Sequence, residues 1–221
     1  MSNPFPYAGV NENLRPHLDK IIIYGEYDIP GLSFGYAPTI LDIGANVGAY
    51  SYWALNRFPG AMVFAYEPSP ENVKAYLTNL NSTHGINSTW RLFNGAVTTH
   101  PNTEIDFYLS QVNAGMHSIH QGMTNTTLAE VIKVPTFHPN RLPNCDILKL
   151  DTEGCEVEII HNYIPSHVLP SVISLEFHSR FDYYELENFL SKDYVPFRGQ
   201  ILHPDLGTIN YIRNDLAEQV K

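Results

Sequence analysis

Acidic residues and one histidine follow two apolar segments of the chain and could carry out acid–base or metal chemistry. The stretch Asp151–Glu156 (DTEGCE) places three carboxylates within six residues, directly after the apolar run 145–150. Glu176 and His178 follow a second apolar run, 171–175. Both runs have the length and composition of buried strands. Carboxylates at a strand end are costly unless they are solvated, paired or used, so these residues are candidate functional groups.

A second set of residues has the composition of a cofactor-binding turn. Residues 40–43 predict a buried strand, 44–48 form a turn of small residues, and a helical pattern begins at Ala49. Strand, turn and helix in this order can hold an adenosine cofactor at a helix N-terminus. The spacing Gly44-x-Asn46-x-Gly48 lacks the third glycine of the dinucleotide fingerprint. It is closer to the Asp-x-Gly-x-Gly-x-Gly loop of S-adenosylmethionine (SAM) enzymes, with Asn46 in place of the middle glycine. Asn suits that position because it tolerates unusual backbone angles. An ordinary tight turn is the alternative.

Two further strand ends carry polar residues. Glu67 ends the predicted strand 61–66, roughly 20 residues after the glycine loop, where an acidic side chain can hydrogen-bond the ribose hydroxyls of an adenosine cofactor. A surface carboxylate is the alternative. The predicted strand 89–93 ends at the corner 94–96, a candidate adenine contact. Because the carboxyl ends of parallel strands lie along one edge of a sheet, all of these groups should converge.

The elements that position these groups alternate between strand and helix. Helical patterns at 49–58, 70–84, from 156 onward and 182–190 predict a mostly parallel sheet with helices on both faces. A further strand is expected at 104–109, and a closing antiparallel hairpin at 195–198 and 208–213. Residues 1–20 are expected to form an arm, or a short helix around 11–19. The polar segment 110–127 predicts a long loop, and its His117 and His120 are more typical of plain loop residues than of ligands.

Length and charge exclude several classes of protein. The chain has 221 residues and a hydrophobic fraction of 43%, which suits one domain: an N-terminal extension at 1–37 and a cofactor-binding core at 38–221. A formal net charge of −10 argues against a nucleic-acid partner. No apolar run approaches the ~20 residues of a membrane span, and no signal peptide is evident. We therefore expect a cytoplasmic protein without a membrane partner.

Taken together, these motifs resemble the FkbM family of SAM-dependent methyltransferases over about residues 38–180. The resemblance rests on the order and spacing of DIGANVG at 42–48, YEPSPEN at 66–72, Ala96-Val97, ILKLDTEG at 147–154 with Glu156, and EFH at 176–178. It implies an α/β, Rossmann-like class I methyltransferase fold, with a mostly parallel seven-stranded sheet and a C-terminal antiparallel hairpin. The implied activity is O-methylation of a hydroxyl on a small molecule or a sugar.

The same resemblance implies roles for individual residues. The backbone at Gly44, Ala45, Asn46 and Gly48 would approach the methionyl part of SAM, with Asp42 supporting the loop. Glu67, followed by Pro68, would bind the ribose, and Gly95 and Ala96 would flank the adenine. Asp151 would sit beside the methyl-transfer centre.

In the expected mechanism a substrate hydroxyl attacks the methyl carbon in line, and holding the two reactants together supplies most of the rate enhancement. Asp151, Glu153 and His178 are the candidate catalytic bases. A divalent cation held by Asp151, Glu176 and His178, by analogy with metal-dependent O-methyltransferases, ranks below a metal-free site. A catalytically silent SAM-binding module remains an alternative. An NAD-linked oxidoreductase is less favoured, because the third glycine is missing.

Overall fold

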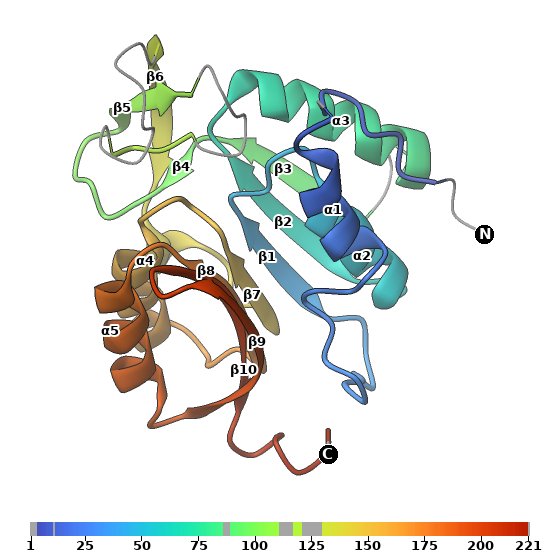
Figure 1. The fold of residues 1–221 in the computed structure, drawn as a ribbon, viewed down its shortest axis with the longest axis vertical. Coiled ribbons are helices and arrows are strands. Elements are labelled where there is room, and N and C mark those ends of the chain that lie inside the picture. Colours follow the sequence, from blue (N-terminus) through green and yellow to red (C-terminus); the bar gives the residue numbers. More distant parts are fainter. Residues whose placement is uncertain (1–3, 11, 86–88, 111–116, 121–129, 221) are drawn as a thin grey trace.

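A seven-stranded sheet forms the centre of the fold (Figure 1). The computed structural model describes residues 4–10, 12–85, 89–110, 117–120 and 130–220. The strand order is β3-β2-β1-β7-β8-β10-β9. The strands are β1 (Thr39–Ile43), β2 (Met62–Glu67), β3 (Trp90–Asn94), β7 (Ile147–Leu150), β8 (Val172–Phe177), β9 (Tyr194–His203) and β10 (Leu206–Arg213). The first five in spatial order are parallel, and β10 is antiparallel to both of its neighbours. The expected sheet and closing hairpin are confirmed.

Helices cover both faces of this sheet, as the alternating pattern predicts. Figure 1 shows α1 (Arg15–Ile22), α2 (Ala49–Arg57) and α3 (Pro70–His84) on one side, and α4 (Glu156–Tyr163) and α5 (Arg180–Leu190) on the other. The central strands are therefore covered twice, so Leu41 and Leu148 are fully buried. Near-continuous apolar runs are what such doubly covered parallel strands require.

The helix expected at 182–190 begins earlier than predicted. The sequence predicts a capped helix over 182–190, but α5 already begins at Arg180. Its N-cap is Ser179, whose hydroxyl accepts a hydrogen bond from the backbone N–H of Asp182 (3.0 Å). The serine satisfies an amide that would otherwise lack a partner at the helix start.

A second, smaller sheet lies at the carboxyl edge of the first. Its order is β4-β6-β5, with β4 at Ala96–Val97, β5 at Glu104–Leu109 and β6 at Glu130–Phe137. The expected strand at 104–109 exists, but it pairs antiparallel with β6 rather than with the main sheet. Sequence reasoning did not identify β6, because Pro135 interrupts its apolar pattern.

The N-terminal segment packs on the core rather than projecting from it. The short helix expected around 11–19 is α1, which spans Arg15–Ile22. It packs beside α2 and buries Leu18. Leu14 and Phe5 are buried in the same apolar cluster as α2 and α3. Within the described ranges, every helix is too short or too polar to cross a bilayer.

Candidate functional site

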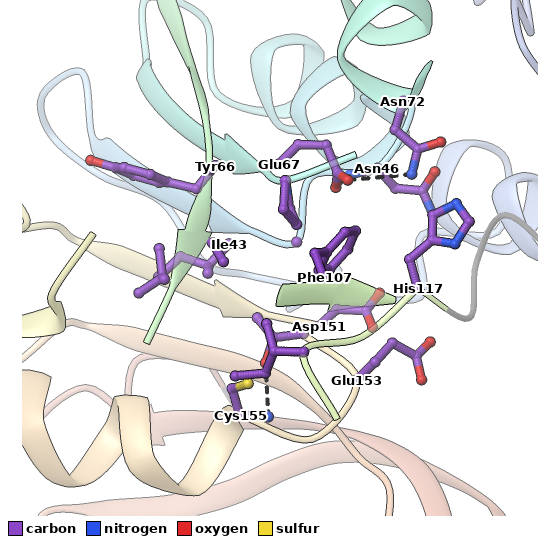
Figure 2. A pocket seen from close by; sticks show the side chains of 17 residues that line it. Ile43, Asn46, Tyr66, Glu67, Asn72, Phe107, His117, Asp151, Glu153 and Cys155 are labelled. Carbon is purple, nitrogen blue, oxygen red and sulfur yellow. Dashed lines mark hydrogen bonds between the residues drawn. The ribbon is translucent and has the colours of Figure 1, made fainter. Parts of the chain in front are cut away.

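Two chambers open at the carboxyl ends of the parallel strands. The first chamber is shown in Figure 2 and holds about 570 Å³ of empty space, counting its open mouth. The second chamber holds about 1020 Å³ on the same measure. Both are lined by Gly44, Asn46, Asp151 and Glu153, so the chambers meet at these four residues. Two different molecules could therefore approach each other from opposite sides of this boundary.

The loop after β1 is held tightly against neighbouring backbone. The N–H groups of Gly44 and Ala45 both donate to the carbonyl oxygen of Tyr66 (3.0 Å each). Gly44 has a φ of 76°, and a Cβ atom there would lie 1.7 Å from the carbonyl oxygen of Asp151. No residue with a side chain fits such a contact, so glycine is required. Asn46 also has a positive φ (49°), as its substitution for a glycine predicts.

Glu67 ends β2 and lines the first chamber. Its carboxylate accepts hydrogen bonds from the backbone N–H groups of Asn46 and Ser69 (2.8 Å each). Burial raises the pKa of Glu67 to about 7, although these hydrogen bonds oppose the shift. The side chain is thus a rigid acceptor at the position where the sequence places a ribose contact. Figure 2 shows it close to Asn46 and Asn72.

Four other predicted cofactor residues line these chambers. Pro68, Gly95 and Ala96 line the first chamber, and Ala45 lines the second. The backbone N–H of Gly95 donates to the carbonyl oxygen of Glu67 (3.1 Å), so this corner is fixed relative to the acidic strand end.

Asp42 and Gly48 lie behind the loop instead. Neither residue is among those that line the two chambers. Asp42 is fully buried and accepts a hydrogen bond from Ser51 Oγ (2.7 Å). A Cβ atom at Gly48 would lie 2.5 Å from the side chain of Leu80, so this glycine lets α2 approach α3. Both residues support the loop from within the protein.

Lys149 is a residue of the site that sequence reasoning missed. Its ammonium donates to the carbonyl oxygen of Gly44 (2.6 Å) and pairs with Asp42 Oδ1 (3.2 Å). A longer pair joins it to Asp151 Oδ2 (3.8 Å). Burial alone lowers the pKa of Lys149, but the two aspartates outweigh it and raise the pKa above its ordinary value. A charged residue inside the apolar run ILKL is the signal that could have identified it.

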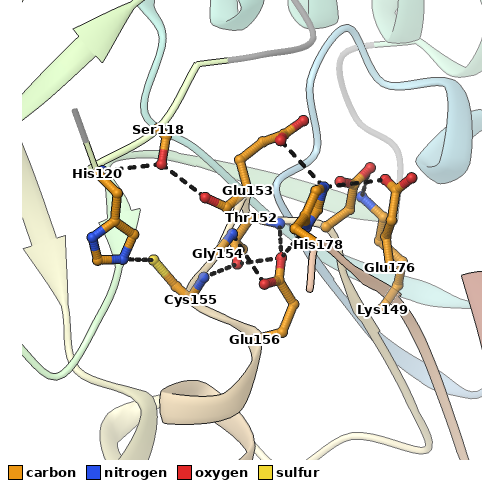
Figure 3. Close-up of polar contacts among 11 residues, drawn as sticks. Ser118, His120, Lys149, Thr152, Glu153, Gly154, Cys155, Glu156, Glu176 and His178 are labelled. Atoms are coloured by element: carbon orange, nitrogen blue, oxygen red, sulfur yellow. Dashed lines mark hydrogen bonds and ion pairs between the residues drawn. The ribbon is translucent and has the colours of Figure 1, made fainter. Parts of the chain in front are cut away.

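His178 lines the second chamber and lies among three glutamates, as Figure 3 shows. Its Nε2 lies 3.2 Å from Glu153 Oε2 and 3.9 Å from Glu176 Oε2, and its Nδ1 lies 3.7 Å from Glu156 Oε1. Burial lowers the pKa of His178, but the three glutamates raise it to about 10. Burial likewise raises the pKa of Glu153 to about 8 and that of Glu176 to about 9.

The turn between β7 and α4 holds Glu153 in an unusual conformation. Glu153 has a φ of 56°, a left-handed conformation that costs energy for a residue with a side chain. Glu156 stabilises the turn, because its carboxylate accepts from the backbone N–H groups of Thr152 (2.7 Å) and Gly154 (3.0 Å). Burial raises the pKa of Glu156, but His178 and these hydrogen bonds bring it below its ordinary value.

Two histidines of the expected loop at 110–127 lie near the first chamber. His117 lines it and accepts a hydrogen bond at Nδ1 from the backbone N–H of Ser110 (2.8 Å). His120 Nε2 lies 3.9 Å from Cys155 Sγ. The rest of that predicted loop, residues 111–116 and 121–127, lies outside the described residues.

The second chamber has walls of opposite character. One wall comes from the acidic strand ends, and the other comes from α1 and the residue before it, through Leu14, His17, Leu18 and Ile21. Ala49 and Tyr50 of α2, Lys149 of β7 and Leu206 of β10 also line this chamber. A ligand with an apolar part and a polar end would match these surfaces.

Comparisons with known proteins identify relatives of the chain. The family model described as "Methyltransferase FkbM domain" matches residues 42–196. "Methyltransferase sdnD" from Sordaria araneosa is 26% identical over an alignment of 171 residues, and the match covers 64% of this chain and 65% of that protein. The chain thus spans slightly less than two thirds of the length of this relative.

Solved structures share the fold. A precorrin-6y C5,15-methyltransferase from Geobacter metallireducens GS-15 has a TM-score of 0.51 at 16% identity, covering 83% of this chain and 85% of that one. A magnesium protoporphyrin IX methyltransferase from Synechocystis PCC 6803, solved with bound SAM, has a TM-score of 0.50 at 10% identity. That match covers 90% of this chain and 79% of the other. Both confirm the Rossmann-like methyltransferase architecture.

Proposed function

Because the chain belongs to the FkbM methyltransferase family, we propose that it transfers a methyl group from SAM to a hydroxyl of a small molecule or a sugar. The observation that carries this proposal is the meeting of the two chambers at Gly44, Asn46, Asp151 and Glu153. Methyl transfer needs a donor and an acceptor that approach each other in line, and the protein must hold them in that orientation. A shared boundary between two chambers provides that arrangement.

The residues of the first chamber fit SAM. The buried side-chain oxygen of Asn46 has no hydrogen-bond partner among the described residues, so it can accept from the ammonium of the methionyl group. Glu67 would accept hydrogen bonds from the ribose hydroxyls, and Gly95 and Ala96, which line the same chamber, would flank the adenine ring. A cofactor bound here would supply the methyl group, with Gly44, Asn46, Asp151 and Glu153 between it and the second chamber.

The acceptor would occupy the second chamber. The acceptor hydroxyl would take the methyl group from the sulfur of SAM, and a carboxylate of the cluster would receive the hydroxyl proton. Glu153 suits this role because it lines both chambers. His178 lies 3.2 Å from Glu153 and can stabilise its ionised form.

Acceptor selection would depend on segments outside the matched family domain. The helix α1 and Leu206 line the second chamber, yet both lie outside residues 42–196. The acidic wall disfavours phosphorylated or carboxylated acceptors, because like charges repel at short range. We therefore propose a neutral or cationic acceptor with one apolar face.

The test is a screen for transfer of a labelled methyl group from SAM to sugars, hydroxylated metabolites and peptides. We expect transfer to a hydroxyl compound, and mass spectrometry of the product identifies an O-methyl ether. Calorimetry with SAM and NAD measures cofactor choice in the same preparation. Binding of SAM without transfer to any class would instead favour a silent binding module, and preference for NAD would overturn the proposal.

A further inference from the structure

We propose that Asp151, Glu153 and His178 together bind a divalent cation of the Mg²⁺ or Mn²⁺ class at the boundary between the two chambers. One ligand atom from each of these side chains lies within 4.8 Å of the other two. Asp151 and Glu153 follow β7, and His178 follows β8, its parallel neighbour. Two carboxylate oxygens and one imidazole nitrogen form a donor set that suits such ions.

Glu156 orients the histidine as a metal ligand needs. The imidazole of His178 is 8% exposed, and its Nδ1 has no aligned hydrogen bond among the described residues. Glu156 Oε1 lies 3.7 Å from this nitrogen and is itself fixed by the turn at Thr152. A carboxylate behind the imidazole favours a proton on Nδ1 and leaves Nε2 free to bind a metal. Nε2 points toward Glu153 and Glu176, as Figure 3 shows.

The charge of the cluster also favours a cation. Asp151, Glu153 and Glu176 all line the second chamber, and their side chains are at least 70% buried. The ammonium of Lys149 is already shared with Asp42 and the carbonyl oxygen of Gly44. Like charges at such separations repel strongly in a partly buried site.

The role of the ion in catalysis rests on the proposed methyltransferase function. Its binding to the three side chains does not. Because its three protein ligands all line the second chamber, an acceptor bound in that chamber could supply a further ligand oxygen. An acceptor oxygen bound there is oriented and becomes more acidic. Glu176, outside the ligand set, then remains available to receive the hydroxyl proton. The sequence alone favoured a metal-free site and considered Glu176 in place of Glu153.

The test is titration of the full chain with Mn²⁺, with free Mn²⁺ measured by electron paramagnetic resonance. We expect one saturable site in the wild type. Glu153→Gln and His178→Gln should each weaken binding at least about tenfold, because each removes a ligand. Glu185→Gln is the matched control: this glutamate on α5 is exposed and lies outside both chambers, so binding should not change. Thermal melting checks that each variant is folded.

Three results would overturn the proposal. The first is no saturable site up to about 1 mM free Mn²⁺, the weak end of protein sites for such ions. The second is equal binding by the wild type and both folded ligand variants. The third is competition between Mn²⁺ and SAM for the protein. That result would indicate that the acidic cluster interacts with the positive charge of the cofactor instead of a metal ion. SAM binding and labelled methyl transfer are measured on the same samples, so failure of the metal site is separable from failure of the methyltransferase function.

Discussion

Replacing Lys149 with methionine removes a buried ammonium group that joins the first loop to the sheet. Methionine is similar in length and unbranched, so the substitution removes the charge and largely keeps the volume. It leaves Asp42, which is fully buried, with a hydrogen bond from Ser51 but without its ion-pair partner. It also leaves the carbonyl oxygen of Gly44 without the donor now 2.6 Å away.

The expected cost follows from this geometry. Removing one partner of a buried pair costs about 3–5 kcal/mol, because the remaining charge is buried without compensation. For a chain of this length, that loss lowers the melting temperature by about 6–20 °C. Adding Asp42→Asn to Lys149→Met should recover part of the loss, because the second change removes the uncompensated charge.

Urea denaturation of Lys149→Met, Asp42→Asn and the double variant measures these changes in the free energy of unfolding. Lys133→Met is the matched control: this lysine forms an exposed pair with Asp106, so its loss should not change stability measurably. Our reasoning on the buried pair is refuted if Lys149→Met and Lys133→Met unfold at the same urea concentration as the wild type.

Four further predictions concern the loop and the two chambers. Glu67→Gln should weaken SAM binding by about tenfold to hundredfold in calorimetry, because a charge-assisted hydrogen bond to the ribose is lost, whereas the exposed control Glu71→Gln should bind normally. Burial raises the pKa of Glu67 from 4.5 to about 7, so the folded state binds that proton more tightly and the associated stability is lost as pH rises between these values. Urea unfolding across this range should show the loss in the wild type, and an equal loss in Glu67→Gln would contradict the assignment. Gly44→Ala should abolish SAM binding, because its Cβ atom would lie 1.7 Å from a backbone oxygen. Gly35→Ala, where nothing lies within 4 Å, should bind SAM normally, and normal binding by both variants would argue against the close approach. Glu153→Gln should lower turnover by about 10²–10⁴ while SAM affinity stays within about threefold of the wild type. An unchanged turnover would exclude Glu153 from the reaction, both as a proton acceptor and as a ligand of a catalytic ion.

The sequence predicted the parallel sheet, its two helical layers and the closing hairpin. Each depends on local patterns, such as the apolar run 40–43 or the serine and proline that start α3. It did not predict β6, whose pattern is broken by a proline and whose partner β5 is separated from it by about 20 residues. The start of α5 was also placed late, because Ser179 is the cap and Asp182 is only in the first turn.

The candidate site divides in the same way. The sequence by itself determined the glycine loop, the acidic end at Glu67 and the carboxylates after β7, because turn chemistry and strand ends are visible in consecutive residues. Tertiary structure decided that Lys149 holds the loop, that α1 forms a wall of the second chamber, and that His178 lies 3.2 Å from Glu153. These contacts join segments far apart in the chain, and their distances depend on strand order and register, which no local pattern specifies.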